Sequence, residues 1–162
     1  MCAFYFKSNN VNLDRAAFPK LNVNNILDFP LPNSNSSKEI NFLSEKASLM
    51  IELNKKLFIL SQKFSTYFSS QYKLAKLPGK LEKWYELEFV DFIKELNKAI
   101  KGVKGTPLNK KDEFEWMDLF EENKKKAQEL KAEIDKTDKE IDAMVYELYE
   151  LSEEEIRIVE NT

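Results

Sequence analysis

The side chains that most often perform chemistry in proteins are scarce in this sequence of 162 residues. It contains no histidine, so the commonest general base and the usual zinc ligand are missing, and a Ser-His-Asp arrangement cannot form. Its 3 glycines form neither GxGxxG nor GxxxxGK[ST], the loops that hold nucleotide phosphates. We therefore expect no active site, and no cofactor or metal held by this chain.

Runs of like charge and a row of aromatic residues are the remaining candidates. The carboxylates at 121–122 and 153–155 and the three lysines at 124–126 are adjacent in sequence, so they diverge around a helix and are more typical of a solvated face than of a site. Four aromatic residues near Lys63 and Lys73 could stack nucleic-acid bases, although their helical spacing first indicates a core. These four are Phe64, Tyr67, Phe68 and Tyr72.

Charge is distributed unevenly along the chain. Residues 1–62 carry 7 basic and 5 acidic side chains, residues 63–111 carry 11 and 5, and residues 112–162 carry 7 and 18. A basic middle beside an acidic tail indicates first that the two parts complement each other, and second that the middle faces phosphates. In the second case the lysines at two helix breaks would contact the DNA backbone, namely Lys73, Lys76, Lys80, Lys83, Lys104, Lys110 and Lys111.

Composition predicts one mainly α-helical domain. The 3 glycines and 5 prolines are too few for the regular turns of a sandwich or barrel. The single cysteine, Cys2, forms no internal disulfide, which favours the cytoplasm. The opening segment lacks the features of a signal peptide, and no stretch approaches about 20 apolar residues, so we expect neither a leader nor a membrane span.

Two stretches have the spacing of long packed helices. In residues 112–151, apolar side chains recur at heptad positions in two seams, one through Phe120 and Ile134 and one through Trp116 and Leu130. Residues 38–72 carry two matching apolar stripes. We predict that these helices pack antiparallel in a coiled-coil-like hairpin.

Polar residues inside the seams are expected to fix the register of that hairpin. Asn123 and Thr137 interrupt the second seam, and Asn54 lies in one stripe of the facing helix. We expect Asn54 to be buried opposite one of these two polar side chains.

A third helix should cover the hairpin. Residues 81–101 form a wide apolar face after the turn at Leu77-Pro78-Gly79. The next break, residues 101–107, leads to Asp112, which we expect to cap the last long helix. Ser152 and Glu155 have the spacing of a capping box, which predicts a short helix at 153–159.

Residues 1–37 do not have a helical pattern. Phe18-Pro19 and residues 29–32 force the backbone out of the helical region, and asparagines favour turns. We predict a short irregular or β arm at 1–37, the end of a recognition domain, followed by a helical domain at 38–162.

Two blocks resemble a known family. The first is FPKLNVNNILDFPLP at residues 18–32, and the second is IDAMVYELYELSEEEI at residues 141–156. They are similar to the end of a TaqI-like specificity domain, the C-terminal target-recognition part of bacterial type II restriction-modification enzymes that fuse an endonuclease with an adenine-specific DNA methyltransferase. The resemblance spans residues 18–160. It departs at Glu150, where that family often has glycine, so we expect a less sharp break before Ser152.

The resemblance implies a function that the residues alone do not. The methylation motif (Asn-Pro-Pro-aromatic) and the cleavage motif (Pro-Asp with Glu-x-Lys) are both missing here, although the parent enzyme would use S-adenosylmethionine and magnesium. It implies a helical portion that braces the target-recognition domain, with double-stranded DNA and the methyltransferase or endonuclease part as partners. The alternative is a helical scaffold for protein-protein interaction or homodimer formation without DNA binding.

Overall fold

A computed structural model of the chain describes residues 37–161, and every regular element in that range is a helix. The elements are α3 (Ser37–Gln71), α4 (Gly79–Glu82), the 3-10 helix η1 (Trp84–Glu86), α5 (Phe89–Gly102), α6 (Lys110–Leu148) and α7 (Glu153–Glu160). The mainly α-helical class is confirmed for these residues. The predicted arm at 1–37 lies outside them except for its last residue.

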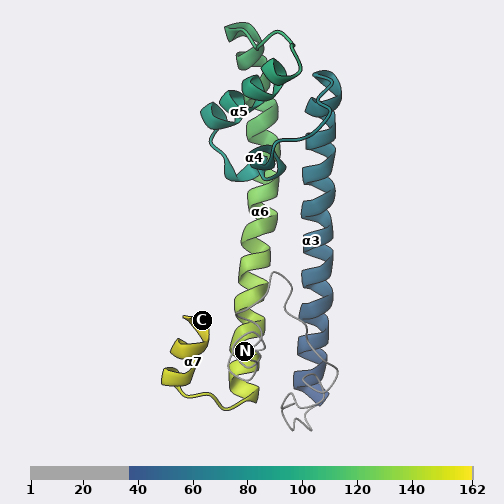
Figure 1. The fold of residues 1–162 in the computed structure, drawn as a ribbon. Coiled ribbons are helices and arrows are strands. Elements are labelled where there is room, and N and C mark those ends of the chain that lie inside the picture. The colour runs from purple at the N-terminus through teal and green to yellow at the C-terminus, as the bar shows by residue number, and fades with distance from the viewer. Residues whose placement is uncertain (1–36, 162) are drawn as a thin grey trace. The chain divides into compact units, whose positions relative to one another are not determined.

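The described residues divide into two compact units, one that includes residues 37–44 with 140–161 and the other formed by residues 45–139. The second unit contains most of α3 and α6 together with α4, η1 and α5 (Figure 1). We call it the central unit. The described part of the first unit contains the start of α3, the end of α6 and α7.

In the central unit α3 and α6 pack antiparallel, as the two apolar patterns predict (Figure 1). The indole Nε1 of Trp116 donates a hydrogen bond of 2.9 Å to the hydroxyl of Tyr72 at the end of α3. Further back along α3, the pKa of Lys56 is raised mainly by its hydrogen bond to Glu52 and more weakly by the charge of Glu133. Because the α6 residue number rises as the α3 number falls, the two helices run in opposite directions.

An aromatic core joins this hairpin to the shorter helices. Phe92 of α5 stacks on Phe120 of α6 with 4.6 Å between ring centroids, and Phe64 of α3 lies 4.3 Å from Trp84 of η1. The largest side chains with almost no exposed surface all belong to this cluster: Trp84, Phe68, Phe92, Phe120, Leu81, Leu96 and Ile100. Together α4, η1 and α5 therefore form the predicted cover.

The prediction of one covering helix over 81–101 is wrong, because the chain breaks between α4 and α5. In an unbroken helix Glu88 would lie four residues from both Trp84 and Phe92, in the middle of the apolar face. Instead, Leu87 and Glu88 are extended, Glu88 is the N-cap of α5, and its side chain is 80% exposed. The break keeps a carboxylate out of the core.

Two predicted polar roles are also wrong. α6 begins at Lys110, and its cap is Asn109, whose side-chain oxygen accepts from the backbone N–H groups of Lys111 (2.8 Å) and Asp112 (3.1 Å). The carboxylate of Asp112 accepts a hydrogen bond from the backbone N–H of Asn109, so Asp112 supports the capping residue and is not the cap itself. Asn54 is exposed and its amide donates to the carbonyl of Met50 in its own helix, so it faces neither Asn123 nor Thr137.

The turn after α6 is sharp, contrary to the expectation from Glu150. Glu150 has a φ of 51°, the left-handed conformation that favours glycine. The N–H of Leu151 bonds the carbonyl of Tyr146, and that of Glu150 bonds Glu147, which is a Schellman motif. The predicted capping box then starts α7, because Ser152 accepts from the Glu155 N–H and Glu155 from the Ser152 N–H.

Candidate nucleic-acid interface

Lys73 sits at the end of α3 in a strained backbone position. Its φ is 51°, and the N–H of Leu74 bonds the carbonyl of Ser69 while that of Lys73 bonds Ser70. This Schellman motif places a lysine where glycine is usual, next to the negative end of the helix dipole. Lys76 follows in the loop and is exposed.

Lys104 occupies the equivalent position after α5. Its φ is 57°, and the N–H of Gly105 bonds the carbonyl of Ile100. A Cβ on Gly105 would lie 2.8 Å from the Ile100 side chain, so a glycine is needed one residue after the left-handed lysine. The loop then returns to α5, because the N–H of Leu108 donates 2.8 Å to the side-chain oxygen of Asn97.

Four of the seven predicted lysines are paired with carboxylates. The contacts are Lys80 with Glu95 (3.2 Å), Lys83 with Glu86 (4.0 Å), Lys110 with Glu113 (2.7 Å) and Lys111 with Glu115 (4.0 Å). The hydrogen bond from Lys80 lowers the pKa of Glu95. Since all four lysines are largely exposed, these pairs hold their side chains weakly.

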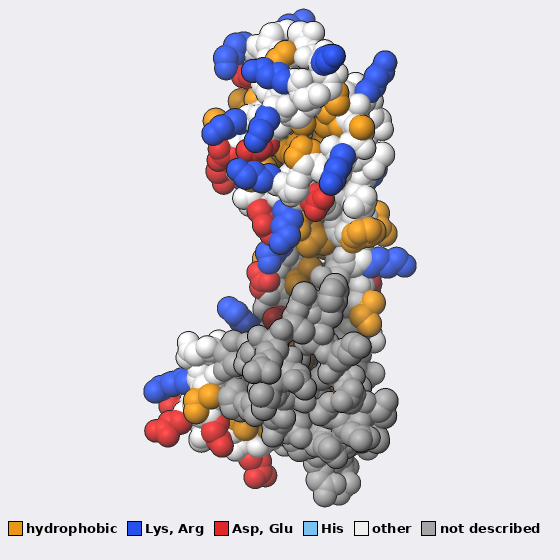
Figure 2. All heavy atoms as spheres, in the orientation of Figure 1, with side chains coloured by type: hydrophobic (Ala, Val, Ile, Leu, Met, Phe, Trp, Pro, Cys, Tyr) orange, Lys and Arg blue, Asp and Glu red, His pale blue; other side chains and the backbone are white. Residues whose placement is uncertain are grey.

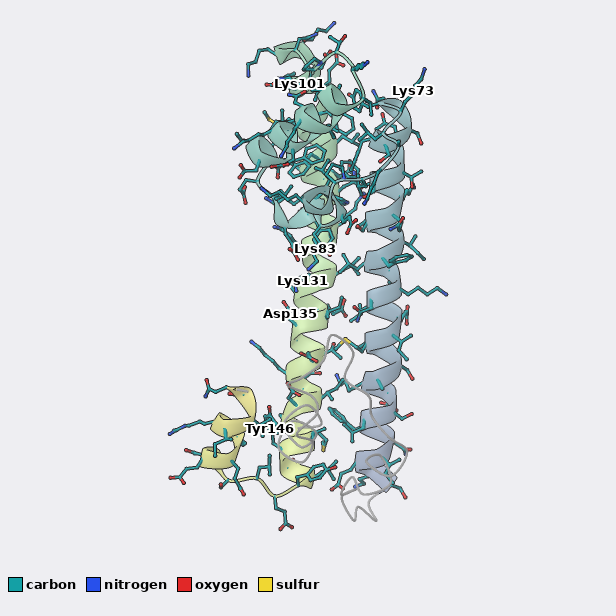
Figure 3. The ribbon with its side chains drawn as sticks, in the orientation of Figure 1. Lys73, Lys83, Lys101, Lys131, Asp135 and Tyr146 are labelled. Carbon is teal, nitrogen blue, oxygen red and sulfur yellow. The ribbon has the colours of Figure 1, made fainter. Side chains whose placement is uncertain are left out.

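The other three predicted lysines, Lys73, Lys76 and Lys104, have no carboxylate within ion-pair distance among the residues the structure describes. Figure 3 shows Lys73 and Lys101 near the same end of the central unit, where α3 ends and α6 begins. Lys83 lies beside a later part of α6, at the level of Lys131, so it is separated from Lys73 and Lys101.

Sequence reasoning limited to the helix breaks missed a row of lysines on α5. Lys94, Lys98 and Lys101 follow the i, i+4, i+7 spacing of one helix face, and all three are exposed. None of them has an ion-pair partner within residues 37–161. The spacing of these lysines can be seen in the sequence, but the stretch was interpreted by its apolar residues alone, as a covering helix.

We call residues 69–80 and 94–111 the basic end of the central unit. It contains one acidic side chain, Glu95, against nine lysines: Lys73, Lys76, Lys80, Lys94, Lys98, Lys101, Lys104, Lys110 and Lys111. Figure 2 shows basic side chains, all of them lysines, spread over this end, with apolar groups between them and few carboxylates. Such an arrangement can contact several phosphates without reading bases.

The remaining sequence candidates divide between the core and the surface. Phe64 and Phe68 are buried in the core, which confirms the core interpretation for them, while Tyr67 is 52% exposed and Tyr72 half-buried. Lys124 is buried, with its Nζ 3.0 Å from Glu88 and 5.8 Å from the ring centre of Phe120. It therefore holds the start of α5 against α6.

No helix within residues 37–161 is long and apolar enough to cross a membrane. No group of three or more His, Cys, Asp or Glu side chains in the same range could hold a metal ion.

Comparison with known proteins gives a family without an assigned activity. No curated protein and no solved structure matches the chain. A family model described as "Domain of unknown function (DUF8810)" matches residues 36–145, which is more than half of the sequence and includes the entire central unit. The chain therefore belongs to the DUF8810 family.

Proposed function

We propose that this chain is the helical portion of a DNA sequence-specificity module of a bacterial type II restriction-modification enzyme. The antiparallel hairpin braces the target-recognition part, and the basic end contributes non-specific contacts to the DNA backbone. The observation that carries the DNA contact is the charge of that end, which has nine lysines, of which only Lys80, Lys110 and Lys111 are paired with carboxylates among the described residues. Phosphate contacts of this type supply affinity and position but no sequence information.

The position of Glu150 supports the resemblance on which the rest of the proposal depends. The resembled family often has glycine there, and in this chain the residue has a φ of 51°. A position that demands the left-handed conformation is where a glycine is expected. The backbone conformation at residue 150 is therefore compatible with the glycine that the resembled family often has there.

DNA binding by the full chain tests this proposal. We expect a fluorescently labelled duplex of unrelated sequence to bind at low salt with a dissociation constant of about 10⁻⁴ to 10⁻⁶ M, and the affinity to fall steeply as salt is added. Replacing Lys73, Lys101 and Lys104 together with Gln should weaken binding and reduce the slope of log K against log salt by up to about 3. Absence of binding at low salt, or affinity independent of salt, would contradict the proposal.

The second candidate is a protein-interaction scaffold, which the exposed apolar residues of α3 favour. Ile51 is 71% exposed and Phe58 is 63% exposed, and they lie seven residues apart on one face. This candidate predicts a stable dimer, or a complex with the methyltransferase part, that persists at salt concentrations that abolish DNA binding. Light scattering in high salt, with Ile51→Ser/Phe58→Ser as the variant, separates the two functions.

A further inference from the structure

A small pocket of different character adjoins the basic end. It lies between the end of α3 and the start of α6, and has a volume of about 150 Å³. Its lining consists of Tyr67, Gln71, Tyr72, Asp112, Glu115, Trp116 and Leu119. A drug-sized ligand needs about 300–1,000 Å³, whereas a cavity of about 150 Å³ accommodates a group the size of benzene. The pocket therefore suits one compact chemical group.

Three of the seven lining residues are aromatic, namely Tyr67, Tyr72 and Trp116. The ring centroid of Trp116 lies 5.8 Å from that of Tyr67 and 6.1 Å from that of Tyr72. The hydrogen bond from the indole of Trp116 to the hydroxyl of Tyr72 fixes these two rings, while Tyr67 is 52% exposed. Ring faces carry negative electrostatic potential and attract cations.

The charged residues of the lining also favour a cation. Two of the seven side chains, Asp112 and Glu115, are carboxylates, and none of the seven is a lysine or arginine. Asp112 accepts a hydrogen bond from the neutral N–H of Asn109, and Glu115 has only a 4.0 Å contact with the largely exposed Lys111. The pocket is thus a negative site beside a surface that is otherwise rich in lysine.

We propose that this pocket binds a trimethylammonium group. A quaternary ammonium has no N–H donors to satisfy, and its methyl groups pack against rings while the carboxylates balance its charge. A metal ion would need many oxygen ligands in a closed shell, and a primary ammonium is more strongly hydrated. The same chemical group occurs in free choline-type metabolites and in trimethylated lysine side chains.

Titration of the full chain with choline tests the proposal. The neutral analogue 3,3-dimethylbutan-1-ol has the same shape without the charge, and ionic strength is held constant with sodium chloride. We expect choline, and not the alcohol, to shift the Trp116 indole N–H resonance, with a dissociation constant of about 1 mM or tighter. A second pair consists of N-acetyl-trimethyllysine amide and its unmethylated control, N-acetyl-lysine amide. If the trimethyllysine compound binds more tightly than choline, the natural ligand is a protein side chain, and if choline binds more tightly, it is a free metabolite.

Two variants test the assigned contacts without disturbing the core. Tyr67→Leu removes an exposed ring, and Glu115→Gln removes one charge; each should weaken choline binding by about threefold or more. Phe58→Leu, at an aromatic position on α3 that is also more than half exposed but lies outside the pocket, should leave binding unchanged. Equal binding of choline and the alcohol, or the same affinity in Tyr67→Leu as in the unaltered chain, would overturn the proposal. DNA binding is measured separately, and its failure would leave this result intact.

Discussion

The core of the central unit and the turn into α7 are defined by different kinds of contact. In the core, aromatic side chains from four segments bury one another almost completely. In the C-terminal stretch at residues 140–161, α7 has no buried residue, and the turn before it is defined by the Schellman motif at Glu150 and the capping box at Ser152. Stability of the first therefore depends on side-chain volume, whereas the turn into α7 depends on hydrogen bonds of the backbone and of the Ser152 and Glu155 side chains.

The largest effect should come from the core. Phe92 is fully buried and contacts Phe64, Phe68, Trp116 and Phe120, so Phe92→Ala should lower the free energy of unfolding by about 3–5 kcal/mol. Val90, two residues earlier on α5, is 76% exposed, and Val90→Ala should change stability by less than about 0.5 kcal/mol. Urea denaturation of both variants measures the difference, and similar losses would refute the assigned core.

A smaller loss should follow removal of one hydrogen bond at the edge of that core. Tyr72→Phe keeps the ring but leaves the indole N–H of Trp116 without its acceptor. Because Trp116 is 6% exposed, we expect a cost of about 1–3 kcal/mol, measured by thermal unfolding. Burial also raises the pKa of Tyr72, so the folded state keeps its proton longer than the unfolded state does. Folding stability should fall as the pH rises through the ordinary tyrosine pKa of about 10, and less so in the variant.

In the C-terminal stretch, a change of backbone preference should outweigh the loss of a side chain. Glu150→Gly removes a carboxylate but relieves the left-handed strain at this position. That strain destabilises a non-glycine residue by about 1–2 kcal/mol, whereas the greater flexibility of glycine in the unfolded chain costs about 0.5–1 kcal/mol. We expect a net gain of about 0.5–1 kcal/mol in local stability. Hydrogen exchange at the Leu151 amide measures it, with Glu147→Gly inside the helix as a control that should destabilise.

The smallest effect should be a pH dependence of the α7 cap. Hydrogen bonds from the backbone and side chain of Ser152 lower the pKa of Glu155, so its contribution is present above the ordinary glutamate pKa and is lost as the pH falls through the lowered value. The Ser152 amide should exchange faster in that acidic range. Glu155→Gln should remove the pH dependence, and an unchanged profile in that variant would show that the cap does not involve this carboxylate.

Apolar periodicity predicted the two long helices and their antiparallel packing because burial of Phe120 and Trp116 is a property of spacing along one helix. The capping box at Ser152 was likewise readable, since its two residues are three positions apart. The break at Glu88 was not, because it results from competition between helix continuation and burial of a carboxylate beside Trp84 and Phe92. The cap at Asn109 was missed because asparagine and aspartate three residues apart are both good N-cap residues.

The candidate interface was predictable in part for a similar reason. The lysines at the helix breaks are visible as a composition bias, but which of them have carboxylate partners depends on the fold. Lys80 meets Glu95, fifteen residues away, only because α4 lies against α5. The acidic aromatic pocket joins Tyr67 to Asp112 across the hairpin, and no local pattern indicates such a pairing.

The most direct test of the central claim separates DNA affinity from stability. Lys73→Gly/Lys104→Gly removes two charges from the basic end and also relieves two left-handed positions, while Lys55→Gln/Lys139→Gln removes two exposed charges elsewhere in the central unit. For each protein, duplex binding at low salt and the melting temperature are measured together. We predict that the glycine variant melts higher and binds DNA more weakly, by about tenfold if both lysines contact phosphates, whereas the glutamine control loses little affinity. Equal affinities for the two variants would contradict a DNA interface at the basic end.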